Sequence, residues 1–384
     1  MAGLRASLQL LPFRIMPKIL VDLLSYTGTK GGMETYAREL YRAIAAANSE
    51  FEFVGLASKE GFALDQSWFP GTVIDSGISG ENRFAWAFGE LFMVTRWAKK
   101  LSADLIHSPA TLGTMSRAVP SVVTMHDMLY WSHPNLMSTG LYTGPVKWME
   151  RRAAQAATRI LTISDVSRDE IVKFLRVSPD RLDVVPLSGT ASPSVDRSRF
   201  TSSAQGMLLA TGNRRPHKNW EGIIRALPLV PEGIRPRVVI TGSHGDDPLR
   251  AVVTELGLEK WIDLKGWVTA EDLENLYSTA TAMVMPSFCD GFCLPALEAM
   301  MAGVPVMLSD IPVYREVSAD AALYFTPTDS ASIAAAISTA VTNPTFMAEL
   351  VERGYTQAAK YSWKKTAAGT LDTFRAALAA RTGS

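Results

Sequence analysis

The chain has 384 residues, and 38 Lys and Arg residues balance 38 Asp and Glu residues, so the formal net charge is zero. A neutral total argues against a nucleic-acid binder that relies on a broad basic surface. With 47% hydrophobic and 20% charged residues, the composition is that of a globular protein and excludes disorder as the main state. At roughly 100–200 residues per domain, the length predicts two domains.

Two cysteines, Cys289 and Cys293, are too few for a disulfide framework or a Cys-based zinc site. No apolar run approaches the roughly 18–20 residues that a membrane-spanning helix needs. We therefore expect soluble domains in the cytoplasm. Residues 1–15 are interpreted as an extension ahead of Met16 rather than a signal peptide, because no small-residue cleavage site follows them.

Short apolar runs alternate with helical stretches along the chain, which is typical of parallel strands buried on both faces. Twelve runs are predicted strands, at 19–24, 51–57, 104–107, 122–125, 159–163, 182–187, 207–210, 238–241, 262–264, 282–285, 304–308 and 322–325. A break at 188–205, rich in Ser, Thr and Pro, indicates a linker between two Rossmann-like domains. Because such sheets bind ligands at the carboxyl ends of their strands, we expect the site in a cleft between the domains.

The most informative segment is 286–306 (PSFCDGFCLPALEAMMAGVPV), which follows a predicted strand and leads into a helix near Pro295. Gly291 lets the backbone approach a ligand, and the helix start then forms an anion site suited to phosphate. The N–H groups that would face outward belong to Phe292, Cys293 and Leu294. Asp290 and Glu298 can both face the same ligand, where carboxylates suit sugar hydroxyls. The alternative is that Asp290 acts as a helix cap and Glu298 is a solvated helix residue.

A second loop, in 207–220 (MLLATGNRRPHKNW), carries three cations between a predicted strand and a helix. Arg214, Arg215 and Lys218 would suit a diphosphate, because they neutralise charge as a leaving group departs. The alternative is a solvated basic loop. No G-x-x-x-x-G-K-[ST] or G-x-G-x-x-G pattern occurs, so a nucleotide hydrolase or an NAD enzyme would lack its usual phosphate loop.

Two features of the first half fall at the same edge of the predicted sheet. Gly31 and Gly32 open a helix after the first strand, and they provide either a close approach to phosphate or sugar or a tight turn. His126 ends another strand, where it would contact a sugar hydroxyl, stabilise developing charge or serve as a structural residue. Asp127 could fix the tautomer of His126, and His107 is a weaker candidate for the same cleft.

These segments together resemble the retaining glycosyltransferases of family 4, which have the GT-B fold, from Lys18 to about Arg375. The family's Glu-(seven residues)-Glu pattern is present as Asp290 to Glu298. Residues 211–219 resemble the form G-x-x-x-P-R-K-N of a mannosyltransferase-like branch. Further segments that fit the family are 31–40, 124–127, 162–171, 309–317 and 321–327.

The resemblance implies that Lys218 holds the donor diphosphate, that Glu298 holds the nucleotide ribose, and that His126 lies beside the sugar ring. Asp290 and the N–H groups after it would hold the transferred sugar and the distal phosphate, which Gly32 would approach from the first domain. The catalytic residues expected are His126, Lys218 and Asp290. The donor-binding residues expected are Gly31, Gly32, Asn213, Arg214, Lys218, Trp267, Val268, Asp290, Gly291, Phe292, Cys293, Leu294 and Glu298.

Three segments depart from the family pattern, and one of them is LSGT at 187–190, which replaces the common P-N-G-V interdomain turn. Asp290 replaces the usual first Glu and is one methylene shorter, which leaves the identity of the sugar open. His217 replaces the Arg that often precedes the lysine, and Asn213 stands where many relatives have Arg or Thr. Arg214 or Arg215 would compensate for the charge.

The implied activity is retaining transfer from a nucleotide-diphosphate sugar to a hydroxyl of a glycan or lipid-linked acceptor, in cell-surface polysaccharide or glycolipid synthesis. A GDP-mannose-like donor is favoured, and a UDP-sugar is next. No Asp-x-Asp motif occurs, so we expect no metal and no cofactor besides the nucleotide-sugar co-substrate. The alternatives are a GT-B-fold sugar-nucleotide epimerase and a catalytically inactive nucleotide-sugar-binding protein.

The expected domains are an acceptor-side domain at 1–188, a donor domain at 189–361, and a helix at 362–384 that packs back on the first domain. Aromatic and basic residues at 84–100 form either an interfacial helix, which would make a peripheral contact at the inner membrane face, or a stripe packed in the first domain. Packing is the favoured alternative. The sequence carries no signal for an oligomeric state.

Overall fold

The computed structural model describes residues 16–29, 31–137, 140, 143–190 and 206–382. The interpreted extension at 1–15 and most of the predicted linker lie outside these residues. The described strands of the first half are β1 (Lys18–Leu23), β2 (Glu52–Ala57), β3 (Thr72–Asp75), β4 (Leu105–Ser108), β5 (Ser121–Met125), β6 (Arg159–Thr162) and β7 (Leu182–Val184). Those of the second half are β8 (Met207–Thr211), β9 (Arg237–Ser243), β10 (Ile262–Gly266), β11 (Ala282–Met285), β12 (Val306–Ser309) and β13 (Ala322–Phe325).

Helices separate the strands in both halves. Those of the first half are α1 (Gly32–Ala46), α2 (Lys59–Phe62), α3 (Arg83–Phe88), the π-helix η1 (Gly89–Met93), α4 (Val94–Lys100), α5 (Leu129–Ser132), α6 (Pro134–Met137), α7 (Thr143–Ala156) and α8 (Asp165–Leu175). Those of the second half are the 3₁₀ turn η5 (Pro216–Lys218), α9 (Trp220–Ala226), α10 (Arg250–Glu255), α11 (Ala270–Thr279), α12 (Leu294–Ala302), α13 (Pro312–Ser318), α14 (Ser330–Thr342), α15 (Pro344–Ala358) and α16 (Trp363–Thr382).

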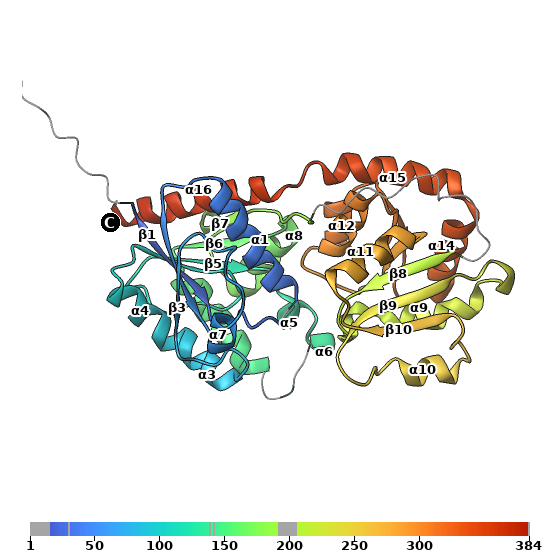
Figure 1. Cartoon of the computed structure of the whole chain (residues 1–384), viewed down its shortest axis with the longest axis horizontal. Coiled ribbons are helices and arrows are strands. Elements are labelled where there is room, and N and C mark those ends of the chain that lie inside the picture. The colour runs from blue at the N-terminus through green and yellow to red at the C-terminus, as the bar shows by residue number, and fades with distance from the viewer. Residues whose placement is uncertain (1–15, 30, 138–139, 141–142, 191–205, 383–384) are drawn as a thin grey trace, which may run out of the picture.

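The strands form two parallel sheets, one in each half of the chain, as Figure 1 shows. The first has the order β3-β2-β1-β4-β5-β6-β7 and the second the order β10-β9-β8-β11-β12-β13. The two Rossmann-like domains expected from the sequence are therefore confirmed. One strand was missed, because β3 is a short strand at the edge of its sheet and none of its four residues is fully buried. Strands such as β5 and β11 are buried along their whole length, which produced the continuous apolar runs.

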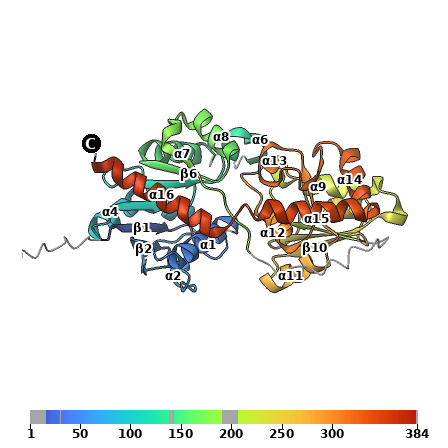
Figure 2. The same cartoon turned by 90° about the horizontal axis from the view of Figure 1, so that it is seen from above.

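The last two helices join the domains a second time. Figure 2 shows α15 along the second domain and α16 along the first. The α16 residue Phe374 is fully buried, and its ring centroid lies 6.1 Å from that of Phe51 and 5.0 Å from that of His107. The helix at the end of the chain thus completes the core of the first domain.

Strand order reverses once in each sheet, between β1 and β4 and between β8 and β11. At such a switch point, the loops after the two central strands diverge and leave a crevice outside their carboxyl ends. In the second sheet these loops are 212–219 and 286–293, the two segments that carry the predicted cations and carboxylate. In the first sheet the loop after β1 leads to Gly31.

The aromatic segment at 84–100 is packed on one side and exposed on the other. Trp86 and Trp97 pack against the core of the first domain. Phe84, Phe88 and Phe92 lie on the surface, with 87%, 55% and 59% of their areas exposed. Among the described helices, none combines the length and apolar character that a membrane crossing requires.

Candidate active site

Lys218 and Asp290 meet at the switch point of the second sheet. The Nζ of Lys218 lies 2.7 Å from Oδ2 of Asp290, and the Tyr314 hydroxyl donates to the same oxygen at 2.9 Å. Asn219 adopts a left-handed conformation (φ 54°), and its amide donates to the carbonyl oxygen of Pro286 at 3.0 Å. Asn219 thereby fastens the lysine loop to the loop that carries Asp290.

Both residues of the Lys218–Asp290 pair are ionised. Burial acts to raise the pKa of Asp290, but the Lys218 ammonium outweighs it and the pKa is lowered. Burial likewise acts to lower the pKa of Lys218, but Asp290 raises it above its ordinary value. Burial, followed by the Lys218 charge, lowers the pKa of His217 to about 4, so this imidazole is neutral at pH 7. Its Nδ1 has no hydrogen-bond partner among the described residues.

The loop after Asp290 turns sharply into α12. Cys293 precedes the helix with φ 111°, a left-handed conformation that is strained for a residue with a side chain. Pro295 occupies the first turn, as expected. The helix thus begins beside Asp290, and its first N–H groups have no partners within the helix. Phe292 and Leu294 flank Cys293 in this turn.

Glu298 lies one turn into α12 and faces the connection between the domains. Its Oε1 accepts a hydrogen bond of 3.0 Å from Thr190. Gly189 passes so close that a Cβ there would lie 2.9 Å from Cγ of Glu298. Burial raises the pKa of Glu298. The carboxylate is therefore held by the interdomain segment rather than solvated.

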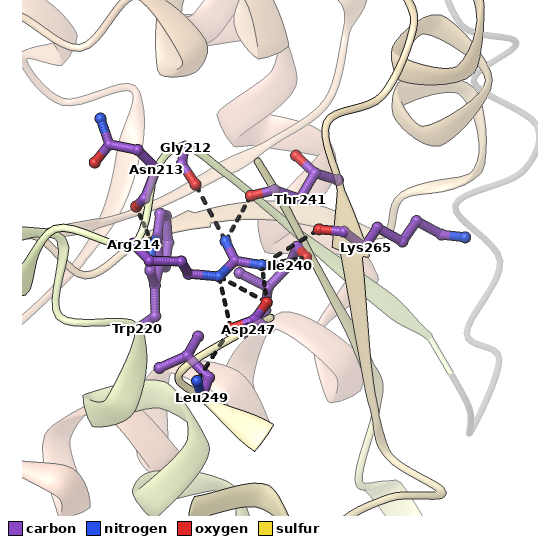
Figure 3. Close-up of polar contacts among 9 residues, drawn as sticks. All are labelled: Gly212, Asn213, Arg214, Trp220, Ile240, Thr241, Asp247, Leu249 and Lys265. Carbon is purple, nitrogen blue, oxygen red and sulfur yellow. Dashed lines mark hydrogen bonds and ion pairs between the residues drawn. The ribbon is translucent and has the colours of Figure 1, made fainter. Parts of the chain in front are cut away.

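The structure corrects the expectation that Arg214 binds the donor. Figure 3 shows its guanidinium near the carboxyl ends of the strands, where it pairs with the Asp247 carboxylate. The shortest distance between the two groups is 2.7 Å. Every N–H of the guanidinium is used, because it also donates to the carbonyl oxygens of Gly212, Thr241 and Ile240. The two side chains are only 7% and 5% exposed. Arg214 is thus a structural residue of this domain rather than a diphosphate ligand.

The other predicted donor residues lie at the rim of the site. Trp267 is exposed and stacks on His244, with ring centroids 5.2 Å apart and planes 19° apart. The same indole reaches the first domain, where a Cβ on Gly31 would lie 3.7 Å from it. Asn213 is exposed and Val268 is half-buried. Gly32, the first residue of α1, has open space where a Cβ would point.

His126 reaches the junction of the two domains from β5. Its Nε2 donates to the carbonyl oxygen of Pro109 at 2.9 Å, and its ring meets that of Tyr36 edge-on. Burial lowers the pKa of His126, so the ring is neutral and Nδ1 carries the lone pair. Pro109, not Asp127, fixes this tautomer. Asp127 instead accepts a hydrogen bond from the backbone N–H of Leu129 at 3.1 Å.

His107 does not belong to the site, which corrects the weaker expectation for it. It is fully buried between the hydroxyl groups of Tyr41, at 2.5 Å, and Thr124, at 3.0 Å. Burial lowers the pKa of His107 to about 3. It is a core histidine whose two nitrogens are satisfied.

Gly291 contacts the first domain directly, which sequence reasoning missed. A Cβ on Gly291 would lie 2.6 Å from the carbonyl oxygen of His126. The hydroxyl groups of Ser164 and Ser167 lie 3.1 Å and 3.5 Å from the carbonyl oxygen of Gly291. Glu316 accepts hydrogen bonds from the first turn of α8. The two serines and Glu316 lie in the segments 162–171 and 309–317, which fit the family pattern but contain none of the predicted site residues.

Two family descriptions match the chain: Glycosyltransferase Family 4 over residues 30–187 and Glycosyl transferases group 1 over residues 196–357. O-antigen chain mannosyltransferase B of Escherichia coli is 32% identical over 295 residues, which cover 73% of this chain and 76% of that protein. O-antigen chain mannosyltransferase RfbU of Salmonella typhimurium is 28% identical over 215 residues, which cover 56% of this chain and 59% of that protein.

Solved structures share the two-domain architecture. Sucrose-phosphate synthase from Thermosynechococcus elongatus has a TM-score of 0.76 and 18% identity, over 95% of this chain and all of that one. HepE from Anabaena, solved with UDP and glucose, has a TM-score of 0.72 and 16% identity, over 94% of this chain and all of that one. The fold is therefore GT-B. The two family descriptions and the relative at 32% identity show that the protein is a glycosyltransferase. The chain belongs to glycosyltransferase family 4.

Proposed function

We propose that the protein transfers a sugar, with retention at the anomeric carbon, from a nucleotide-diphosphate sugar to a hydroxyl of a glycan or lipid-linked acceptor. The observation that carries this proposal is the pairing of Lys218 with Asp290 at the switch point, beside the start of α12. A mannosyl donor is favoured, because O-antigen chain mannosyltransferase B is the relative at 32% identity. Cell-surface polysaccharide synthesis is the setting that this relative suggests.

The donor diphosphate would lie against the lysine and the helix start. Lys218 and the N–H groups of Phe292, Cys293 and Leu294 offer positive charge there, and α12 has its positive dipole end beside Asp290. A helix start and a cation of this kind stabilise the charge that develops on a departing diphosphate. Glu298 would then exchange its bond to Thr190 for the ribose hydroxyls of the nucleotide.

In the transfer step, the bond between the anomeric carbon and the diphosphate oxygen breaks, and a bond to the acceptor oxygen forms on the same face. The acceptor proton passes to an oxygen of the leaving phosphate. Asp290 would accept hydrogen bonds from the sugar hydroxyls. His126 would contact the sugar through neutral Nδ1, which accepts from a hydroxyl and adds no competing positive charge.

We also propose that the reaction requires no metal ion, because Lys218 and the α12 N–H groups supply the positive charge. Among the residues that the structure describes, no three His, Cys, Asp or Glu side chains gather as a metal-binding group. The test is transfer activity after exhaustive chelation with EDTA. Unchanged activity is expected, and a loss that Mg²⁺ or Mn²⁺ restores would contradict the proposal.

A lipid-linked acceptor would bring the protein to a membrane surface. We propose that Phe84, Phe88 and Phe92, exposed on α3 and η1, insert into that surface, and that the exposed bases Arg96 and Lys99 contact anionic headgroups. Co-sedimentation with vesicles tests this. Binding should increase with anionic lipid content and fall when Phe88 and Phe92 are both replaced by Ser; equal binding by that variant would contradict it.

The nucleotide base is the part of the donor that the site leaves most open. A calorimetric screen with GDP, UDP, dTDP and ADP should give the tightest binding for GDP, followed by UDP. Turnover of the matching nucleotide sugars with a glycan acceptor pool then tests transfer. Binding without any turnover would favour the inactive binding protein, and interconversion of the free nucleotide sugar would favour the epimerase.

A further inference from the structure

The first turn of α8 is completed by the other domain. The N–H groups of Asp165 and Val166 donate to the two carboxylate oxygens of Glu316 on α13, at 2.7 Å and 3.1 Å. The next N–H, that of Ser167, donates to the Ser164 hydroxyl at 3.1 Å. A helix cannot satisfy its first N–H groups internally, and a carboxylate there also meets the positive end of the helix dipole. Ser164 thus caps α8 from within the first domain, and Glu316 of the second domain accepts from the two N–H groups that Ser164 leaves without a partner.

The same turn holds the loop that carries Asp290. The Ser164 hydroxyl donates to the carbonyl oxygen of Gly291 at 3.1 Å, and the Ser167 hydroxyl donates to that of His126 at 3.1 Å. The two hydroxyl groups lie 2.9 Å apart, and that of Ser167 lies 3.5 Å from the Gly291 carbonyl oxygen. The Gly291 N–H donates to Oδ1 of Asp290 at 3.1 Å, so the Ser164 hydroxyl bonds the residue next to the Lys218 partner.

Only glycine fits at this contact. A Cβ on Gly291 would lie 2.6 Å from the His126 carbonyl oxygen and 2.9 Å from Cβ of Asp127, and both distances are shorter than real Cβ contacts. The sequence interpretation assigned the glycine to a close approach by a ligand. The structure shows a second requirement for glycine at position 291, because the backbone there lies against the backbone of His126 in the first domain.

We propose that Glu316, Ser164 and Ser167 are positioning residues that hold the two domains at the angle required for transfer. The inference rests on the proposed function, because that function needs His126 and Gly32 from one domain opposite Lys218 and Asp290 from the other. These contacts are few and polar, so they can form and break as substrate enters and product leaves. We refer to Glu316, Ser164, Ser167 and Gly291 as the interdomain seam.

The variant Glu316→Ala removes the contact that joins α13 to α8. Its matched control is Asp329→Ala, because Asp329 caps α14 within the second domain by accepting from the N–H of Ala331 at 2.9 Å. Both variants lose a carboxylate cap, but only the first crosses between domains. Glu316→Gln, which keeps one acceptor oxygen, should behave between Glu316→Ala and the unaltered protein.

Two measurements test the proposal, and only the second depends on catalysis. Small-angle X-ray scattering should show a larger radius of gyration for Glu316→Ala than for Asp329→Ala. Rates with the nucleotide sugar should show kcat/KM reduced roughly five- to tenfold, the equivalent of one lost helix cap. The Kd of the nucleoside diphosphate, whose proposed contacts other than Gly32 lie in the second domain, should change less than about twofold.

The outcomes separate this proposal from the proposed function. Scattering and kcat/KM for Glu316→Ala that match those of Asp329→Ala would overturn the positioning role. If the unaltered protein turned over no nucleotide sugar, the proposed function would fail, and the scattering comparison would still decide whether the seam sets the domain angle. A loss in Glu316→Ala/Ser167→Ala smaller than the product of the two single losses would support a shared seam, and a loss equal to that product would contradict it.

Discussion

Lys218 and Asp290 are 72 positions apart in the chain, yet they form an ion pair of 2.7 Å across the switch point of the second sheet. Each residue follows a central strand, β8 for the lysine and β11 for the aspartate. The sheet topology alone brings these loops together, because strand order reverses between those two strands. The pair places a cation beside the start of α12 before any ligand arrives.

Replacement of Lys218 by Ala should reduce transfer by about 100-fold or more, because loss of one preorganised donor to a developing anion typically costs that much. Initial rates with the best nucleotide sugar are the measurement. Lys260→Ala is the control, since Lys260 is an exposed lysine of the same domain that pairs with Glu232. A Lys218→Ala enzyme with an unaltered rate would refute the phosphate role.

Glu298→Ala should weaken binding of the nucleoside diphosphate by roughly 10- to 100-fold, the usual cost of a lost hydrogen bond to a charged group. Calorimetry measures it. Thr190→Ala is the matched control, because it removes the hydroxyl that donates a hydrogen bond to the Glu298 carboxylate and leaves Glu298 in place. Its affinity should be equal or higher. Equal losses in both variants would mean that the contact supports the interdomain segment and that the ribose binds elsewhere.

The sequence predicted the sheets well because their strands are buried on both faces, and it predicted the loops that follow those strands, whose role in binding stays a prediction. Lys218 and Asp290 lie in these loops. The partner of each cation in the loop could not be predicted. Arg214, for example, is neutralised by Asp247, which lies 33 positions further along the chain. Contacts between the two domains could not be predicted from the sequence either. No periodicity indicates that Glu316 caps a helix in the other half.

The Arg214–Asp247 pair leads to a prediction about stability. Arg214→Ala should destabilise the second domain by about 3–5 kcal/mol, because it leaves a buried carboxylate without its cation. At roughly 2–4 °C per kcal/mol for a domain of this size, calorimetry would detect the fall in Tm. Arg214→Met/Asp247→Leu should recover only part of it, since Asp247 also accepts from the Leu249 N–H.

Nucleotide affinity decides how that result is interpreted. The Arg214→Ala protein, measured well below its Tm, should bind the nucleoside diphosphate within about twofold of the unaltered protein. An unchanged Tm combined with lost affinity would show that Arg214 binds the donor and would contradict its structural role.

The buried carboxyl of Glu150 makes the stability of the first domain depend on pH. It lies on α7, and its Oε2 accepts from Nε1 of Trp131 at 2.6 Å. Burial raises the pKa of Glu150 from 4.5 to about 8. Between these two pKa values the folded chain keeps a proton on Glu150 that the unfolded chain releases. The contribution of this proton to the free energy of unfolding is therefore complete below pH 4.5 and is lost as the pH rises toward 8.

Glu150→Gln keeps an acceptor oxygen for Trp131 and removes the titration. Between pH 5 and pH 8 the unaltered protein should lose ~1.4 kcal/mol of stability per pH unit relative to this variant. The measurement is the Tm of the first domain at several pH values. Glu349→Gln, at an exposed carboxyl on α15, is the control and should follow the unaltered protein. Parallel curves for Glu150→Gln and the unaltered protein would show that Glu150 is ionised when folded, because only a carboxyl that holds its proton produces the difference in slope.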